Sequence, residues 1–558
     1  MYSWILPRRS DPLKAISGTT FWRVVLGDPG SEATTALHMM SMKQPVRFQK
    51  FLFDVKTNHA ETSRHEQAEE VRSAHDSGKS ERRIVPQQRA DQARETKPGN
   101  AGAGKASEPS RVSDRTPPVL RDGISVLNRL DRITERAEAH PEQTFDNVYT
   151  LLNFELLWNA FRKLKRDKAP GVDGVTVDQY EANLRDNLKD LETRLHRQIY
   201  RPRPSLRRDI PKGNGKTRPL GIAAVEDKIV QRAVVMVLER IYEVDFQDSS
   251  YGFRPGRSCH DALRMLGRHI GTKKVSWISD ADIRGFFDNV NHARLVELLG
   301  KRISDPRMLW LIGRFLKAGV MVEGKCLDTE EGVPQGSVLS PLLANVYLHY
   351  ALDQWFERDV CPRLRGEAYL VRYADDFICA FQHESDARRF QTVLPKRLAR
   401  FSLEVADEKT KLLRFGRFAA RDSDRLGEGA PGTFDFLGFT HYCGQSRAGK
   451  FKLKRKTAKK KLRMKTRALK DWFRANLTTP VSAVWTTMNQ KLRGHYQYYG
   501  VNDNWPWLMR YREATLRMAR RWLLRRSQRG KLGLVFFHQT YIQRHPVALP
   551  RHLVDLIA

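Results

Sequence analysis

Cysteines, long apolar runs and acidic residues are all scarce in this chain. Its 558 residues include only five cysteines, and no two of them form a Cys-x-x-Cys pair. An odd, scattered set of cysteines indicates a reducing compartment and argues against a disulfide framework or a structural zinc site. No run of 18 apolar residues occurs, so a membrane span is not expected.

Aromatic residues are missing from a long stretch near the N-terminus. None occurs between Phe53 and Phe145, and residues 56–118 are rich in Glu, Arg, Ser, Gln, Lys, Pro and Gly. Such a segment cannot bury enough apolar surface to offset the entropy lost on ordering, so it is predicted to be a disordered linker. Residues 1–55 are predicted to be an N-terminal extension of unknown role.

Acidic residues are outnumbered by basic ones, with 64 Asp and Glu against 98 Lys and Arg, for a net charge of +34. Because phosphate neutralisation supplies most non-specific affinity for nucleic acids, this surplus favours a polyanionic partner; an anionic membrane surface is the rival. Residues 450–531 alone hold 24 basic residues and three acids. Their basic run 452–465 is predicted to open a helix. The Trp and Tyr residues interleaved with the charge either stack on unpaired bases or form a helix core.

Two adjacent carboxylates stand in Tyr373-Ala374-Asp375-Asp376, inside the largely apolar stretch 369–381. The apolar and aromatic flanks predict a β-hairpin that carries the acids at its turn. Adjacent like charges repel one another, and a divalent cation such as Mg²⁺, which prefers oxygen ligands, would remove that repulsion. The alternative is a solvated hairpin turn.

A third carboxylate is supplied by Asp282. A site that holds two metal ions needs more than one carboxylate pair, and residues 275–283 are predicted to form a strand that ends in acids. Asp280 is assigned a structural role, and Asp288 is predicted to cap the helix that follows. Phe287 stands five residues after Asp282; in a site that joins nucleotides, an aromatic ring there would pack beneath the sugar and exclude a 2′-hydroxyl.

A glycine-bearing loop precedes a predicted helix. Gly332 and Gly336 permit close backbone approaches that a side chain would block. Between them, Gln335 could touch a base or the template edge, and the alternative is a plain loop that enters a helix. Ser340 and Pro341 are predicted to be the N-cap and the first residue of that helix, which ends near residue 360.

A basic hairpin is predicted at residues 210–222. Its Gly-Asn-Gly sequence is a turn signal, and Lys212, Lys216 and Arg218 flank that turn. These side chains can grip a triphosphate as charge-assisted donors. The alternative is a solvated basic turn.

In this order, the four blocks resemble the fingers and palm of reverse transcriptases of the group II intron type. Similar segments also occur at residues 168–174, 248–257, 403–410 and 436–439, so the resemblance covers about residues 152–442. Farther on, residues 492–500 (Leu-Arg-Gly-His-Tyr-Gln-Tyr-Tyr-Gly) resemble the signature of the maturase domain of that family. The resemblance implies an α+β, right-hand polymerase fold. Its fingers and palm, with an antiparallel sheet, are followed by an α-helical thumb or maturase domain.

The resemblance also implies a role for each site residue. Metal ligation and catalysis are implied for Asp282, Asp375 and Asp376. Nucleotide contacts are implied for Lys212, Arg218, Phe287 and Gln335. Contacts to intron RNA are implied for Arg493, Tyr496 and Tyr499.

The implied function is that of an RNA-directed DNA polymerase encoded by a group II intron, which binds the intron RNA, assists its splicing and copies it into DNA. The expected cofactor is a pair of Mg²⁺ ions, with Mn²⁺ as the alternative. The expected partners are intron RNA, a DNA target or primer and deoxynucleoside triphosphates, with no membrane partner and a homodimer left open. The expected location is a bacterial cytoplasm, with an organelle as the alternative.

Two other functions stay open on the sequence. One is a reverse transcriptase of the retron, CRISPR-associated or diversity-generating type; the other is a non-catalytic RNA-binding splicing factor. Ligands for the Cys/His endonuclease domain of many intron proteins are not found, so endonuclease activity is not expected. The expected domains are an N-terminal extension at 1–55, a disordered linker at 56–118, fingers and palm at 119–442, a basic helical maturase or thumb domain at 443–540, and a C-terminal tail at 541–558.

Overall fold

The computed structural model describes residues 125–211, 217–526 and 533–556. The predictions for the N-terminal extension, for the linker and for Lys212 and Lys216 fall outside these residues. The described part mixes helices with sheets that are antiparallel except at one pairing, as expected of an α+β fold. None of the helices in these ranges combines the length and the apolar character needed to cross a membrane.

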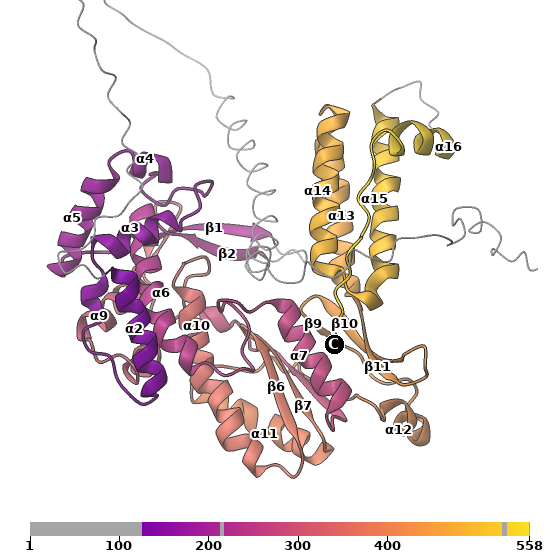
Figure 1. The fold of residues 1–558 in the computed structure, drawn as a ribbon, viewed down its shortest axis with the longest axis horizontal. Coiled ribbons are helices and arrows are strands. Elements are labelled where there is room, and N and C mark those ends of the chain that lie inside the picture. The colour runs from indigo at the N-terminus through magenta and orange to yellow at the C-terminus, as the bar shows by residue number, and fades with distance from the viewer. Residues whose placement is uncertain (1–124, 212–216, 527–532, 557–558) are drawn as a thin grey trace, which may run out of the picture. The chain divides into compact units, whose positions relative to one another are not determined.

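A four-stranded antiparallel sheet, here called the central sheet, has the strand order β6-β7-β3-β8. Its strands are β3 (Trp277–Ala281), β6 (Ala368–Tyr373), β7 (Asp376–Phe381) and β8 (Lys411–Arg414). Helix α7 (Cys259–Thr272) packs on β6, and helix α11 (Glu384–Ala399) packs on β3 and β7 (Figure 1). The sheet is therefore covered by helices rather than open to solvent.

Strand β7 is buried on both of its faces. Phe377, Cys379 and Phe381 join the apolar core that contains α11. Ile378 and Ala380, which point the opposite way in a strand, join the core that contains α7. A strand covered on both faces needs no alternation of apolar and polar residues, which explains the continuous apolar run in the sequence.

A second sheet has the order β2-β1-β4-β5. Strands β1 (Ser205–Pro211) and β2 (Thr217–Ile222) form the predicted basic hairpin, with Pro211 paired to Thr217. Strand β1 also pairs in parallel with β4 (Val320–Val322), which pairs with β5 (Lys325–Leu327). The remaining helices of the N-terminal half are α2 (Val126–Ala139), α3 (Phe154–Arg162), α4 (Val177–Glu181), α5 (Leu184–His196), α6 (Val225–Asp245), α8 (His292–Gly300), α9 (Pro306–Leu316) and α10 (Ser340–Leu348).

Helix α6 is the central helix of this half, and α2 and α3 both pack on it. The apolar periodicity of residues 226–242 predicts an amphipathic helix. The structure has a helix there, but it is buried on most of its surface rather than along one stripe. The segment at residues 168–174 meets its N-terminus at Gly171. A methyl group on Gly171 would lie 2.5 Å from the Cα atom of Ala224, so this contact requires glycine.

A third sheet, β9 (Phe434–Phe436), β10 (Phe439–Gln445) and β11 (Phe451–Thr457), leads into the C-terminal helices. The prediction that residues 452–465 open a helix is wrong for their first half, because residues up to Thr457 belong to β11 and helix α13 begins at Lys459. Leu453, Arg455 and Thr457 are buried in alternation. This period of two is hidden in the sequence because one of the buried positions is an arginine.

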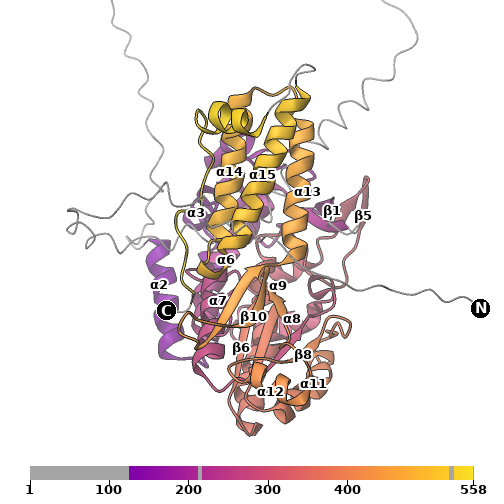
Figure 2. The same cartoon turned by 90° about the vertical axis from the view of Figure 1, so that its right-hand side faces the viewer.

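Three helices, α13 (Lys459–Ala475), α14 (Val481–Tyr499) and α15 (Trp505–Arg525), form the basic C-terminal part (Figure 2). The following residues do not stand apart as a tail. The indole N–H of Trp485 donates to the carbonyl of His545 at 2.9 Å, and the backbone N–H of Ala548 donates to Asn489 at 2.8 Å. Residues 545–556 therefore run along α14, and Val554 forms a bridge with Val501 at its end.

Candidate active site

The two adjacent carboxylates lie where the sequence predicts them, at the tip of the β6–β7 hairpin. Tyr373 pairs with Asp376 across a turn made of Ala374 and Asp375. Asp375 is half-buried and Asp376 is exposed. Ala374 has a φ of 58°, a left-handed conformation that costs a residue with a Cβ atom about 1 kcal/mol. The turn must therefore be held by its surroundings.

Asp282 comes to the same end of the central sheet. Strand β3 pairs with β7 as far as Ala281 and Phe377, and Asp282 is the next residue, level with Asp376. The carbonyl of Asp282 accepts a hydrogen bond from the backbone N–H of Ala406 at 2.8 Å. Sheet pairing thus gathers acids that are about a hundred residues apart in the sequence.

Lys409 forms an ion pair with the carboxylate of Asp282. The hydrogen bond that Lys409 donates to Asp282 is the largest cause that raises the pKa of Lys409, and Asp376 also raises it. The ammonium group therefore lies where the fields of both carboxylates overlap. Lys409 lies in the segment 403–410, whose resemblance to the family implies no role for this residue.

The chemistry of these carboxylates fits a divalent cation, because hard cations take oxygen ligands. The lysine held against Asp282 shows that the position attracts positive charge. Within residues 125–211, 217–526 and 533–556, however, no three His, Cys, Asp or Glu side chains approach closely enough to hold a metal ion together.

The other two acids of the block differ from the metal candidates. The pKa of Asp280 is raised to about 7, chiefly by burial; Lys411 opposes this shift, and the nearby carboxylates of Asp376 and Asp282 contribute to it. The prediction that Asp288 caps a helix is wrong. Asp288 ends a short 3₁₀ turn, and the cap of α8 is Asn291, whose side chain accepts from the N–H of Arg294 at 2.9 Å.

Phe287 is joined to the loop that carries Gln335. The carbonyl of Phe287 accepts from the N–H of Val333 at 2.7 Å. A methyl group on Gly332 would lie 3.0 Å from that same carbonyl oxygen, which explains the glycine. The Phe287 ring is half-buried and packs edge-on against Phe286, with ring centres 5.3 Å apart.

The same loop is joined to the basic hairpin. The carbonyl of Gln335 accepts from the N–H of Gly221 in β2 at 2.7 Å. Gly336 has a φ of 109°, and a methyl group on it would lie 2.7 Å from the carbonyl of Gly221. Backbone contacts therefore connect the loop of Gln335 to Phe287 on one side and to the hairpin of Arg218 on the other.

The side chains of two predicted ligand contacts are open to solvent, and one predicted helix cap is shifted. The side chain of Gln335 is half-exposed and that of Arg218 is exposed, so both are available to a ligand. The predicted cap is displaced by one residue: Leu339 is the N-cap of α10, and Ser340 is its first helical residue.

Two of the three predicted RNA contacts lie in the core. Tyr496 and Tyr499 on α14 are only 5% and 4% exposed. The Tyr499 ring packs on Phe439 with ring centres 5.1 Å apart, and its hydroxyl group lies against Gly438. A buried ring cannot stack on a base, so these residues are corrected to packing roles, whereas Arg493 is exposed and stays a predicted contact.

A basic groove of about 600 Å³ runs along α13 beside α15. Its cations stand four, three and four residues apart on α13, so they share one helix face; they are Arg463, Arg467, Lys470 and Arg474. Leu462 and Met518 supply apolar surface between the charges. We call these four cations the α13 stripe.

Comparison with known proteins shows what these features are similar to. Residues 210–441 match the family model described as reverse transcriptase (RNA-dependent DNA polymerase). The chain is 34% identical over 303 residues to "Group II intron-encoded protein LtrA" of Lactococcus lactis subsp. cremoris, covering 52% of this chain and 50% of that protein. It is 40% identical over 237 residues to "Protein YkfC" of Escherichia coli (strain K12), covering 38% of this chain and 62% of that one.

A third relative is similar over a comparable number of residues. The "Uncharacterized 91 kDa protein in cob intron" of Schizosaccharomyces pombe is 38% identical over 236 residues, or 42% of this chain and 29% of that protein. The chain spans about half the length of the Lactococcus relative. The family match at residues 210–441 includes the carboxylates, the loop of Gln335 and the β1–β2 hairpin from residue 210 onward.

Proposed function

Because residues 210–441 belong to the reverse transcriptase family and the chain is related to proteins encoded by group II introns, we propose that it is an RNA-directed DNA polymerase that also serves its own intron RNA. It binds that RNA, assists its splicing and copies it into DNA. The observation that carries the proposal is that Asp282, Asp375 and Asp376 lie at the same end of the central sheet.

The described elements fit a right-hand polymerase. The β1–β2 hairpin and helices α2 to α5 correspond to fingers, and the central sheet with α7 and α11 corresponds to the palm. The basic helices α13 to α15 correspond to the thumb or maturase domain. This assignment puts the carboxylates on the palm and the groups that hold the substrate around them.

In this mechanism Asp282, Asp375 and Asp376 would hold two Mg²⁺ ions, or Mn²⁺ in their place. Such ions, when bound, would lower the pKa of the attacking 3′-hydroxyl and stabilise the leaving pyrophosphate. Arg218, exposed on β2, neutralises the triphosphate. Lys212, which lies outside the described residues, is proposed to share this role. Gln335, held by the Gly221 contact, faces the base or template.

The intron-encoded type is favoured over the retron, CRISPR-associated and diversity-generating types by the relatives named for introns. The α13 stripe supplies a place for an RNA backbone. The partners proposed are intron RNA, a DNA target or primer and deoxynucleoside triphosphates. A structured intron in the nucleic acid that flanks the coding sequence would separate this proposal from the others.

Purified protein is expected to extend a DNA primer on an RNA template when Mg²⁺ and deoxynucleotides are present. The gathered carboxylates are the physical reason, since they can hold the ions that this reaction needs. Extension is measured by gel electrophoresis of a labelled primer. An intact, folded chain that does not extend the primer would leave only the non-catalytic RNA-binding function.

Phe287→Val is expected to admit ribonucleotides. The smaller side chain leaves room for a 2′-hydroxyl, so the preference for deoxynucleotides should fall by about 100-fold, the limit that an apolar pocket reaches in rejecting one hydroxyl. Single-nucleotide incorporation gives kcat/KM for each substrate. Phe287→Tyr keeps the ring and should keep the preference; equal preference in Phe287→Val and wild type would show that another group excludes the hydroxyl.

A further inference from the structure

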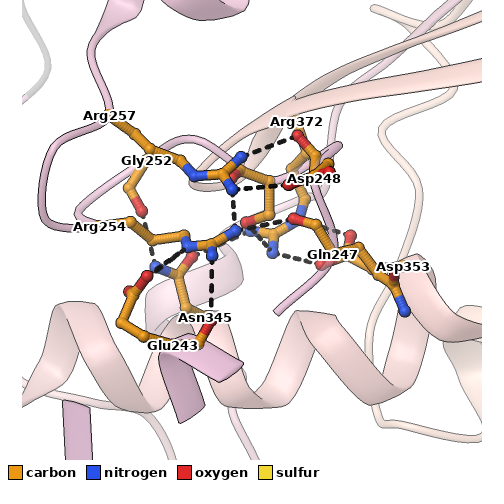
Figure 3. Close-up of polar contacts among 10 residues, drawn as sticks. Glu243, Gln247, Asp248, Gly252, Arg254, Arg257, Asn345, Asp353 and Arg372 are labelled. Carbon is orange, nitrogen blue, oxygen red and sulfur yellow. Dashed lines mark hydrogen bonds and ion pairs between the residues drawn. The ribbon is translucent and has the colours of Figure 1, made fainter. Parts of the chain in front are cut away.

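A buried arginine stands behind the carboxylate turn. Arg372, in β6, has 0% of its surface exposed, and all five of its side-chain N–H donors are used. Nε and Nη2 both donate to the carboxylate of Asp353, which is also fully buried. Nη1 donates to Asn345 Oδ1 at 3.0 Å (Figure 3). Nη2 donates in addition to Ser250 Oγ at 2.7 Å, and Nη1 to the carbonyl of Ala374 at 2.9 Å.

The last of these bonds reaches the turn itself. The carbonyl of Ala374 belongs to the peptide group that continues into Asp375, and a peptide group is planar. Fixing the direction of that oxygen therefore fixes the plane from which the backbone of Asp375 starts. Ala374 adopts its left-handed φ of 58° at this point, so the turn has a conformation that the residue would not choose alone.

A backbone segment from far upstream supports the same turn. The N–H of Tyr251 donates to the carbonyl of Arg372 at 2.9 Å, and the N–H of Arg372 donates to the carbonyl of Ser249 at 2.8 Å. Residues 249–251 thus lie along the outer edge of β6 as an additional, parallel strand partner. Backbone bonds of this kind fix the register between two strands. The segment therefore fixes the position of β6 along the strand direction, and with it the position of the turn that follows β6.

Gly252 brings that segment against the turn. A methyl group on Gly252 would lie 2.3 Å from the backbone nitrogen of Ala374, so only glycine fits. The side chain of Asn345 donates to the carbonyl of Gly252 at 2.6 Å and accepts from Arg372. Asn345 therefore connects both groups that touch Ala374.

A second buried arginine fixes the supporting segment. Arg254, which is 2% exposed, donates to the carbonyls of Gln247 at 2.7 Å and Ser250 at 3.0 Å. It also forms an ion pair with Glu243 of α6 at 3.0 Å (Figure 3). The supporting segment is thereby attached to the central helix of the N-terminal half.

We propose that Arg372 is a positioning residue, which directs Asp375 toward the bound metal ions through the carbonyl of Ala374. The proposal rests on the proposed function, because it assumes that the turn holds metal. A buried ion pair is weak evidence for stability, since the loss of hydration offsets its attraction. Five directed bonds from one guanidinium instead define a geometry, and lysine, with three donors on a point charge, cannot reproduce it.

Arg372→Lys tests this role in the full-length protein. Mn²⁺ binding, followed by the electron paramagnetic resonance of the free ion, is expected to weaken about 10-fold, the lower end for losing a group that orients a metal ligand. Primer extension should then require correspondingly more Mg²⁺, and high Mg²⁺ should restore part of the rate. A thermal melt recorded by circular dichroism reports the folded fraction in each sample.

Arg302→Lys is the matched control. Arg302 is also buried, with 4% of its surface exposed; it is paired with Asp245 at 2.9 Å and donates to the carbonyl of Gln143 at 2.7 Å, and these partners lie away from the turn. The Arg302→Lys variant should be less stable than wild type, but its Mn²⁺ affinity per folded molecule should be unchanged. Equal weakening in both variants would show that Arg372 acts only on stability and would overturn the proposal.

Asn345→Ala covers the case in which Arg372→Lys does not fold, because it removes no charge. It deletes the contact to Gly252 and one acceptor of Arg372, and Mn²⁺ binding should weaken several-fold. Wild-type binding in this variant would overturn the proposal.

Asp375→Asn, titrated in parallel, separates this inference from its premise. If Asp375→Asn binds Mn²⁺ as wild type does, the proposed metal site is wrong. If it binds weakly while Arg372→Lys binds normally, the metal site stands and the positioning role is wrong.

Discussion

Primer extension is expected to fall by at least about 10³-fold, or about 4 kcal/mol of transition-state stabilisation, when Asp375 and Asp376 are both changed to asparagine. The amide keeps the shape of the side chain but removes the negative charge that holds a metal ion. Because both side chains are at least partly open to solvent at the hairpin tip, the fold should be unaffected. Single-turnover extension on an RNA template measures the loss.

The control for this double variant carries the same charge change elsewhere. Asp186 on α5 and Asp424 on α12 (Ala419–Leu426) are both exposed, and changing both to asparagine should leave extension within about twofold of wild type. RNA binding should be unchanged in the hairpin variant, since the α13 stripe is untouched. Normal extension by Asp375→Asn with Asp376→Asn would show that the metal assignment is wrong.

Affinity for intron RNA is expected to fall by about 100-fold when Arg463, Arg467 and Arg474 of the α13 stripe are changed to glutamine. Each arginine that contacts a phosphate adds about one unit to the slope of log K against log salt, so the slope should decrease by about two to three. Glutamine keeps a long side chain and good helix propensity, so α13 should remain intact. Filter binding at several salt concentrations gives both quantities.

The RNA for this assay is the one that co-purifies with the intact chain, identified by sequencing. The control changes three basic residues that lie on or directly after α11, away from the stripe; they are Arg389, Lys396 and Arg400. This triple glutamine variant should bind RNA as wild type does. Two results would count against the maturase role: equal loss in both triple variants, and recovery of random cellular RNA with no enrichment of one intron.

Several elements could be predicted from the sequence because their signals are local. The apolar flanks of Asp375 and Asp376 predict a hairpin, and the structure has one. The Gly-Asn-Gly turn predicts the β1–β2 hairpin, and the periodicity of residues 226–242 predicts α6. In each case residues that are close in the sequence determine the backbone conformation, so the element can be predicted without knowing its distant contacts.

Other features depend on faces that meet only in the folded chain. Tyr496 and Tyr499 resemble exposed RNA contacts in the sequence, yet they are buried against β10. Helical spacing shows which residues share a face but not what covers that face. The same limit hid strand β11, in which a buried arginine interrupts the apolar pattern.

The sequence by itself determined the local elements, the acids of the site and the excess of positive charge. Only the tertiary structure decided how they meet. It placed Lys409 on Asp282 across 127 residues and Ser250 on Arg372 across 122. An arginine within an apolar strand was the one local sign of that network. Its partners could not be identified because burying a charge requires acceptors from wherever the fold brings them, and sequence separation carries no information about that choice.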